Sequence, residues 1–173
     1  MFIIDAFAER PLAGNPAAVC PLDAWLPTST MQAIAAEMNL SETVFFVPAP
    51  QRDAFGIRWF TPTREVDLIG HATLAAGYLV LTRLRSDLPS VHFLSNGSEL
   101  VVTRDGASFA LEMPALRPKA IQPPVELIRG LGCAPKTVLA AKHYLCVFEH
   151  SGEISALVPN MSIIASRNCL RSS

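Results

Sequence analysis

The sequence predicts an α+β fold, and three observations lead to that prediction. Short apolar, β-rich segments recur along the chain, whereas only two segments have the pattern of a substantial helix. One of these helices is amphipathic, and the other is apolar on every side, as expected of a helix enclosed by other elements. Half of the residues are hydrophobic and 17% are charged, which is ample apolar material for a packed core.

The first elements are a strand, a turn and a second short strand. Residues 2–7 are apolar and rich in β-forming types, so they predict the first strand. The stretch 10–16 holds two prolines and a Gly-Asn pair, which is typical of a turn. Residues 17–20 then predict a second, short strand.

A helix follows, and the sequence indicates both its start and its end. Thr28, Ser29 and Thr30 are all possible N-caps. Apolar residues then recur at i, i+3, i+4 and i+7, which forms one stripe along a helix: Met31, Ile34, Ala35 and Met38. Asn39 is a reasonable stop.

Two buried strands lie between this helix and the next. The apolar run 43–47 ends at Pro48, and the run 55–61 places its apolar residues on one face. A loop over 62–70 follows. It contains a charged stretch, 64–67, which we interpret as solvated.

The segment from His71 to Leu84 predicts a helix that is buried in the core. It is shorter than the ~20 apolar residues that a membrane span needs, and Arg83 and Arg85 close it. The N-terminus has no basic stretch of the kind that begins a signal peptide. We therefore expect a cytoplasmic protein with no membrane partner.

Three more strands are predicted before a proline-rich segment. They cover 91–94, 100–104 and 108–112, and the last two join around Asp105-Gly106, a strong hairpin signal. Four prolines then fall between residues 114 and 124, which is typical of a linker.

The linker predicts two domains, an N-terminal one over 1–115 and a partial C-terminal one over 125–173. The C-terminal segment predicts one short helix and up to three strands: a helix at 125–130, strands at 137–140 and 144–148, and a possible strand at 154–158. No persuasive period follows residue 161. A piece of this size is marginal as an independent core.

The net charge and the cysteines exclude some classes of ligand and site. The formal net charge is −1, so no basic excess exists to bind nucleic acid. None of the four cysteines forms a C-x-x-C pair, which gives no support to a zinc or thioredoxin-like site. We expect reduced thiols in all four: Cys20, Cys133, Cys146 and Cys169.

A glutamate opens the most apolar strand of the chain. Glu42 follows Ser41 and precedes the run from Thr43 to Val47. Glutamate is depleted in strands, and partial burial raises the pKa of a carboxyl group toward the range useful for acid–base work. An exposed glutamate at a strand end is an equally good interpretation of the same residues.

Two glycine-containing motifs are further candidates. Gly70-His71-Ala72-Thr73 opens the buried helix, where free N–H groups can bind an anion and His71 can donate or carry a proton. A histidine that merely closes the helix start is the alternative. Gly14-Asn15-Pro16 is either a simple turn or a means of aiming Asn15 at a ligand. The remaining histidines are interpreted as structural or exposed: His92, His143 and His150.

Taken together and in this order, the motifs resemble the phenazine-biosynthesis PhzF family. The resemblance runs from residue 2 to about residue 158, and four stretches carry it: 5–7 with 10–19, 31–43, 59–68 and 70–73. It implies the diaminopimelate-epimerase-like fold, in which two similar domains each wrap a sheet around a central helix. The active site of that fold lies in the cleft between the domains.

The resemblance also implies a set of roles. Glu42 would move a proton between carbons of a small substrate, with no metal or organic cofactor. Gly70, His71, Ala72 and Thr73 would hold a substrate carboxylate, with His71 assisting the proton transfer. Asn15 and Ser41 would be supporting polar contacts, and the protein would be a homodimer.

The second half departs from the family pattern. Nothing after Pro159 matches the acidic residue and the Thr-Gly-Ser-Ala-type turn of the family's second domain. The sequence therefore predicts an incomplete second pseudo-repeat. Two alternatives to the isomerase stay open: a truncated protein that is inactive or only binds a ligand, and a thiol-based racemase on the related fold.

Overall fold

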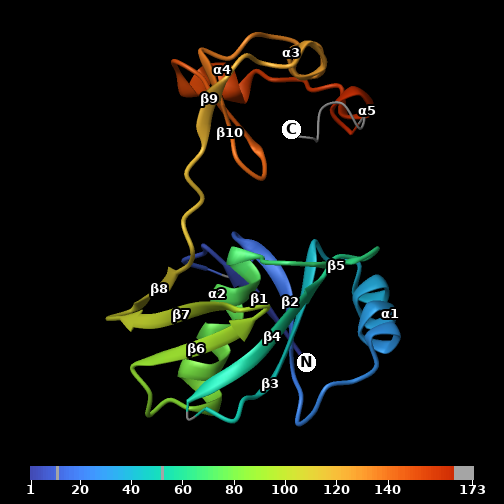
Figure 1. Ribbon diagram of the computed structural model, residues 1–173. Helices are drawn as coiled ribbons and strands as arrows, with labels where there is room; N and C mark the ends of the chain where they lie inside the picture. Colours follow the sequence, from blue (N-terminus) through green and yellow to red (C-terminus); the bar gives the residue numbers. More distant parts are fainter. Residues whose placement is uncertain (11, 52, 166–173) are drawn as a thin grey trace. The chain divides into compact units, whose positions relative to one another are not determined.

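The computed structural model describes residues 1–10, 12–51 and 53–165, and it confirms the α+β class. The chain divides into two compact units, Met1–Pro114 and Ala115–Ser173 (Figure 1). The expected turn at 10–16 includes residue 11, and the expected thiols include Cys169; these two residues lie outside the described part. No described helix is both long and apolar enough to cross a membrane.

A curled sheet forms most of the first unit. Among the described residues it has eight strands, in the order β1-β2-β3-β4-β6-β7-β8, with β5 paired to β4. Their bounds are β1 Phe2–Ala6, β2 Asn15–Pro21, β3 Glu42–Pro48, β4 Ala54–Phe60, β5 Glu65–Val66, β6 Ser90–Ser95, β7 Ser98–Asp105 and β8 Ser108–Glu112. The pairing is parallel between β2 and β3 and between β4 and β6, and antiparallel elsewhere.

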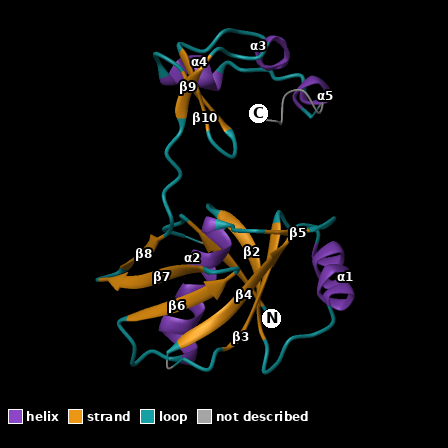
Figure 2. Cartoon of the chain, in the orientation of Figure 1, coloured by secondary structure: helices purple, strands orange, loops and turns teal. Residues whose placement is uncertain are grey.

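The sheet wraps around helix α2, Gly70–Leu79, as predicted for the apolar helix (Figures 1 and 2). Strands from both ends of the sheet contact this helix, and small residues let them approach closely. A Cβ atom at Gly77 would lie only 2.5–2.6 Å from the Val102 side chain on β7. A glycine is therefore required where the helix and the strand meet.

The helix does not keep one geometry to Leu84. It continues as a π-helical segment, η1, Val80–Leu84, in which the N–H of Arg85 donates to the carbonyl of Val80. Side-chain donors occupy carbonyls around this point: Thr82 bonds to Tyr78, and Arg104 bonds to Leu81. Such donors inserted into the helical ladder favour a wider turn.

Helix α1, Thr28–Met38, packs against β3 and β4, and Figure 2 shows it apart from α2. Its end is as predicted, since Asn39 is a left-handed cap with φ of 49°. Its start differs, because Pro27 is the N-cap and no side chain caps the helix. The hydroxyl of Thr28 instead accepts a hydrogen bond from Arg58, 3.0 Å away.

The two faces of the sheet bury separate apolar clusters. The inner cluster joins α2 to alternate strand residues, among them Val44, Phe46 and Trp59. The outer cluster lies under α1 and contains Cys20, Met31, Ala35, Phe45 and Phe60. Consecutive residues of β3 thus point to opposite faces, as strand geometry requires.

The hairpin predicted at Asp105-Gly106 is confirmed by the antiparallel pairing of β7 with β8. The loop expected over 62–70 is wrong in part, because β5 lies within it and pairs with Trp59 and Phe60. Glu65 of β5 is held by the guanidinium of Arg58, so the charged stretch 64–67 is not simply solvated. That partner lies on a different strand, beyond the reach of local sequence patterns.

The second unit is a small sheet with short helices. Its strands pair in the order β11-β10-β9, and its elements are β9 Lys119–Ile121, α3 Val125–Leu131, β10 Thr137–Ala140, β11 Tyr144–Val147, α4 Ser151–Ser155 and α5 Met161–Ile164. The segment 114–124 therefore contains a strand, and the possible strand at 154–158 is wrong. Helix α4 ends within that stretch at Ser155, and residues 156–160 form no strand. At the start of α4, the N–H of His150 donates to the carboxylate of Glu153, 2.8 Å away.

Candidate functional site

Glu42 and His71 meet inside the first unit. His71 Nε2 lies 3.2 Å from Glu42 Oε2, and the two side chains are only 10% and 15% exposed. Twenty-eight positions of chain separate these residues, so the tertiary fold brings them together. The two sequence motifs chosen as candidates therefore form one site.

The strand register explains the position of Glu42. It is the first residue of β3 and lies beside Ala17 of the parallel strand β2. Strand alternation places Glu42 on the same face as Val44, which belongs to the inner cluster around α2. His71 is the second residue of α2, so the strand start and the helix start face each other.

Burial and charge act on His71 in opposite directions. Burial lowers the pKa of its imidazole, and the nearby Glu42 carboxylate opposes this by a smaller amount, so the pKa is lowered overall. The Nε2 atom is buried and makes no well-aligned hydrogen bond, although Glu42 is within ion-pair distance. A neutral imidazole beside a carboxylate is a pair that can accept and return a proton.

The start of α2 supplies free donors next to this pair. Its N-cap is Ile69, in extended conformation, and no side chain caps the helix. The first helical hydrogen bond runs from the N–H of Thr73 to the carbonyl of Ile69, 3.1 Å away. The helix itself offers no acceptor to the earlier N–H groups, those of Gly70, His71 and Ala72. Such a terminus attracts an anion.

Thr73 supports this helix start and is committed within the protein. Its hydroxyl accepts a hydrogen bond from Trp59 Nε1 at 3.0 Å and donates one to the carbonyl of Ile69 at 2.7 Å. The residue is fully buried. Of the four residues expected to hold a substrate carboxylate, Thr73 thus has the least freedom to do so.

Asn15 and Ser41 lie close to Glu42 in the strand register. Asn15 opens β2, two residues before Ala17, and so belongs to the face on which Glu42 lies. Ser41 immediately precedes Glu42, and both Asn15 and Ser41 are exposed. A Cβ atom at Gly14 would lie 2.3 Å from the carbonyl oxygen of Ala6, so only glycine lets the chain enter β2 here.

Two neighbours of the site were missed from the sequence. Trp59 reaches Thr73 through its indole N–H, and Met113 lies beside Gly70, with its Cε 3.3 Å from where a Cβ on that glycine would be. A buried tryptophan needs a partner for its N–H, which is a usable signal. That signal does not say which residue the partner is.

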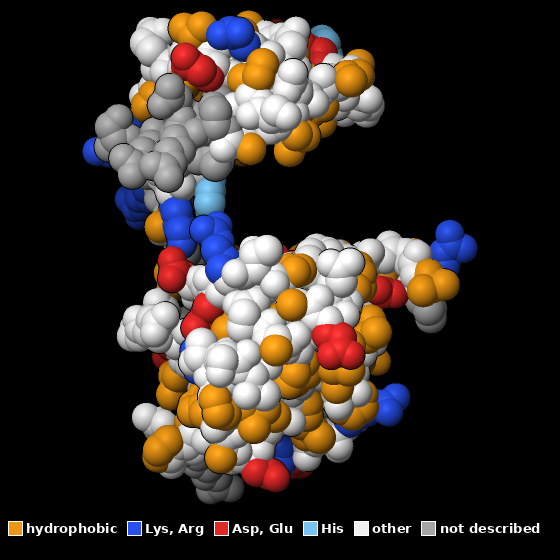
Figure 3. Space-filling model, turned by 90° about the vertical axis from the view of Figure 1, so that its right-hand side faces the viewer, with side chains coloured by type: hydrophobic (Ala, Val, Ile, Leu, Met, Phe, Trp, Pro, Cys, Tyr) orange, Lys and Arg blue, Asp and Glu red, His pale blue; other side chains and the backbone are white. Residues whose placement is uncertain are grey.

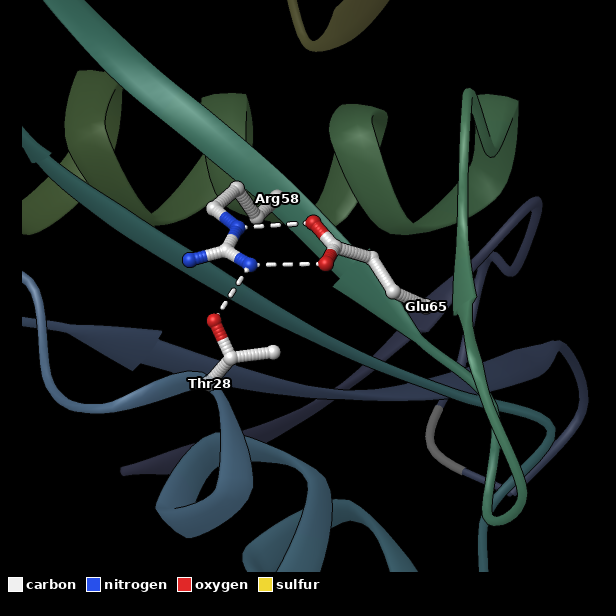
Figure 4. A network of polar contacts seen from close by, with 3 residues as sticks. All are labelled: Thr28, Arg58 and Glu65. Atoms are coloured by element: carbon white, nitrogen blue, oxygen red, sulfur yellow. Dashed lines mark hydrogen bonds and ion pairs between the residues drawn. The ribbon is translucent and has the colours of Figure 1, made fainter.

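A second polar cluster lies on the outer face of the sheet. The guanidinium of Arg58 donates to both carboxylate oxygens of Glu65, each at 2.7 Å, and to Thr28 (Figure 4). The same guanidinium lies 5.5 Å from the ring centre of Trp25 and 5.3 Å from that of Phe60. With these partners, Arg58 fastens β5 to β4.

Known proteins are similar to this chain in sequence and in fold. The family model described as phenazine biosynthesis-like protein (PhzC-PhzF) matches residues 4–168. A Pseudomonas aeruginosa protein named an uncharacterized isomerase is 45% identical over 170 residues, covering 98% of this chain and 64% of the relative. A second uncharacterized isomerase of that organism is 42% identical over 163 residues, covering 94% of this chain and 62% of the relative.

A solved structure agrees. The crystal structure of a phenazine biosynthesis protein of the PhzF family from Enterococcus faecalis aligns with a TM-score of 0.84 and 36% identity. The alignment covers 94% of this chain and 62% of that one. The chain thus spans 62–64% of the length of these relatives. With a family match over most of its length, and with a sheet wrapped around a central helix, the chain belongs to the PhzC-PhzF family of phenazine biosynthesis-like proteins.

Proposed function

We propose that this chain is an isomerase that moves a proton between carbons of a small carboxylate substrate, with Glu42 as the general acid and base. The observation that carries the proposal is the 3.2 Å contact between Glu42 and His71, next to the N–H groups at the start of α2 that have no acceptor within the helix. The two relatives named isomerases support the reaction class. No metal or organic cofactor is required for this chemistry.

The proposed reaction gives each group of the site a role. The substrate carboxylate binds the N–H groups of Gly70, His71 and Ala72, where the helix dipole favours negative charge. The Glu42 carboxylate takes a proton from an adjacent carbon, and the C–H electron pair spreads into the conjugated substrate. Glu42 then returns the proton to another carbon of the same molecule. Neutral His71 holds the Glu42 carboxylate in place. It can also share the proton that Glu42 has taken, while the substrate carries the extra negative charge.

A thiol mechanism is less well supported. Cys20 lies in the outer cluster under α1, on the opposite face of the sheet from Glu42. Burial raises the pKa of its thiol to about 11, so the reactive thiolate is scarce at neutral pH. Cys133 and Cys146 belong to the second unit.

Isotope exchange tests the proposal directly. The purified chain is incubated in D₂O with a panel of amino acids and unsaturated cyclic carboxylates, and deuterium at carbon is measured by NMR. We expect exchange, and we expect Glu42→Gln to slow it by about 10²–10⁴-fold. Glu37→Gln, on an exposed position of α1, is the matched control and should leave the rate unchanged.

The outcomes separate the alternatives. Equal exchange in Glu42→Gln and in the unaltered chain would remove Glu42 from the reaction. Binding of a carboxylate without any exchange would favour a protein that only binds its ligand. The homodimer and the cytoplasmic location remain predictions, which sedimentation and cell fractionation would test.

A further inference from the structure

We propose that Trp59 is a positioning residue that holds the start of α2 at the correct distance from β3, and so sets His71 against Glu42. The consequence for catalysis rests on the proposed function, whereas the anchoring itself does not. The inference comes from a buried hydrogen bond that the reaction does not use, between Trp59 Nε1 and Thr73 Oγ1.

Trp59 is tied to the strand that carries Glu42. It lies in β4, directly across from Val44 of β3 in the antiparallel register. Val44 is two residues after Glu42 and on the same face of the strand. Trp59 is 1% exposed, so its ring is fixed by packing on all sides.

The other end of the contact is tied to His71. Thr73 is two residues after His71 in the first turn of α2. The Thr73 hydroxyl, which accepts the bond from the indole, also donates a hydrogen bond to the carbonyl of the N-cap residue Ile69, 2.7 Å away. One hydrogen-bonded chain therefore runs from the indole through Thr73 to the residue at which the helix begins.

No side chain caps the start of α2, so the hydrogen bond between Trp59 and Thr73 anchors a helix end that would otherwise lack a side-chain contact of this kind. A neutral hydrogen bond between fully buried groups is costly to break, since both partners would stay desolvated. The neighbouring residue Arg58 also binds a segment that follows β4 in the sequence, because its guanidinium pairs with Glu65 of β5 (Figure 4). That contact lies on the outer, more exposed face of the sheet. Of these two anchors, only Trp59 reaches the helix that bears His71.

The test uses the influence of Glu42 on His71 as a molecular ruler. The Glu42 carboxylate raises the pKa of His71, so Glu42→Gln should lower the pKa measured for the imidazole by NMR titration. The size of this response depends on the distance between the two side chains. We expect Trp59→Phe, which keeps the apolar ring and removes the donor, to reduce the response to about half or less.

Trp25→Phe is the matched control, because Trp25 is the other tryptophan of the chain and packs on Arg58 at the outer face. It should leave the response unchanged. Thr73→Val removes the acceptor from the other side and should reduce the response like Trp59→Phe, whereas Thr73→Ser keeps a hydroxyl and should preserve it. The pair of Thr73 variants gives the answer even if Trp59→Phe does not fold.

A full response in Trp59→Phe or in Thr73→Val would overturn the inference, as would an equal loss in Thr73→Val and Thr73→Ser. The ruler needs no substrate, which keeps the two proposals separate. The variants could change the response of the His71 pKa as expected while the unaltered chain exchanges no deuterium. That result would contradict the proposed function and leave the positioning role of Trp59 standing.

Discussion

The two units differ sharply in how much core they bury. The first unit buries apolar side chains on both faces of its sheet, sixteen of them in the cluster around α2 alone. In the described part of the second unit, the buried cluster contains only Leu127 and Val138, with three partly buried neighbours. The proposed catalytic pair thus lies in the region whose packing leaves the least freedom to move.

Strand alternation explains what the second unit leaves exposed. Val138 and Cys146 are paired and share the face that packs with Leu127 of α3. The alternate residues of β11, Leu145 and Val147, are 52% and 38% exposed. Hydrophobic side chains are visible on the surfaces of both units (Figure 3), but among residues 1–10, 12–51 and 53–165 the large buried core belongs to the first unit. Because buried apolar area stabilises a fold, we expect the helix enclosed by the sheet to make the first unit the more stable of the two.

The largest expected effect compares one leucine from each core. Leu79→Ala, at a fully buried position of α2, should lower the free energy of unfolding of the first unit by about 3–5 kcal/mol. Leu127→Ala, in the small cluster of α3, should cost the second unit about 2 kcal/mol or less, because its surroundings can collapse or admit water. Tryptophan fluorescence in urea follows the first unit, which contains both tryptophans, and hydrogen exchange follows the second. Equal losses in the two units would contradict the comparison.

A glycine from each unit gives the next effect. Gly77→Ala would push a methyl group into Val102, so we expect a loss of about 1–3 kcal/mol in the first unit. A Cβ atom added at Gly152 of α4 would meet no other atom within 4 Å, so Gly152→Ala should change stability by no more than about 0.5 kcal/mol. Thermal unfolding of both variants measures this. A neutral Gly77→Ala would mean that the sheet can move away from α2.

The same contrast shows what local sequence can predict. The hairpin at Asp105-Gly106 and the helix end at Asn39 depend on a few adjacent residues, and both are confirmed. The apolar character of 71–84 was sufficient to predict a buried helix. In the second unit the few apolar residues of 154–158 are too short a run to separate strand from helix, and α4, which starts at the contact between His150 and Glu153, takes up only the first two of them.

The site was predictable only in part, because its geometry is not local. Their places at a strand start and a helix start made Glu42 and His71 candidates, and the family resemblance implied their roles. The 3.2 Å contact between them depends on the register of β2, β3 and β4. The roles of Trp59 and Thr73 depend on the same register. A sequence pattern indicates that a buried indole needs a partner, whereas only the fold supplies Thr73.

The smallest expected effect is on the pH dependence of stability, which should differ between the two units. The pKa of His71 is lowered in the folded chain from an ordinary value of 6.5, so the unfolded chain binds a proton that the folded one resists. The stability of the first unit should therefore be complete above pH 6.5 and fall as the pH drops toward the lowered value. His71→Gln should remove this part of the slope, as measured by urea unfolding at a series of pH values. His143→Gln, at an exposed position of the second unit, should leave the slope unchanged. If the slope persists in His71→Gln, the buried imidazole does not account for it, and the neutral state assigned to His71 in the proposed reaction would lose its support.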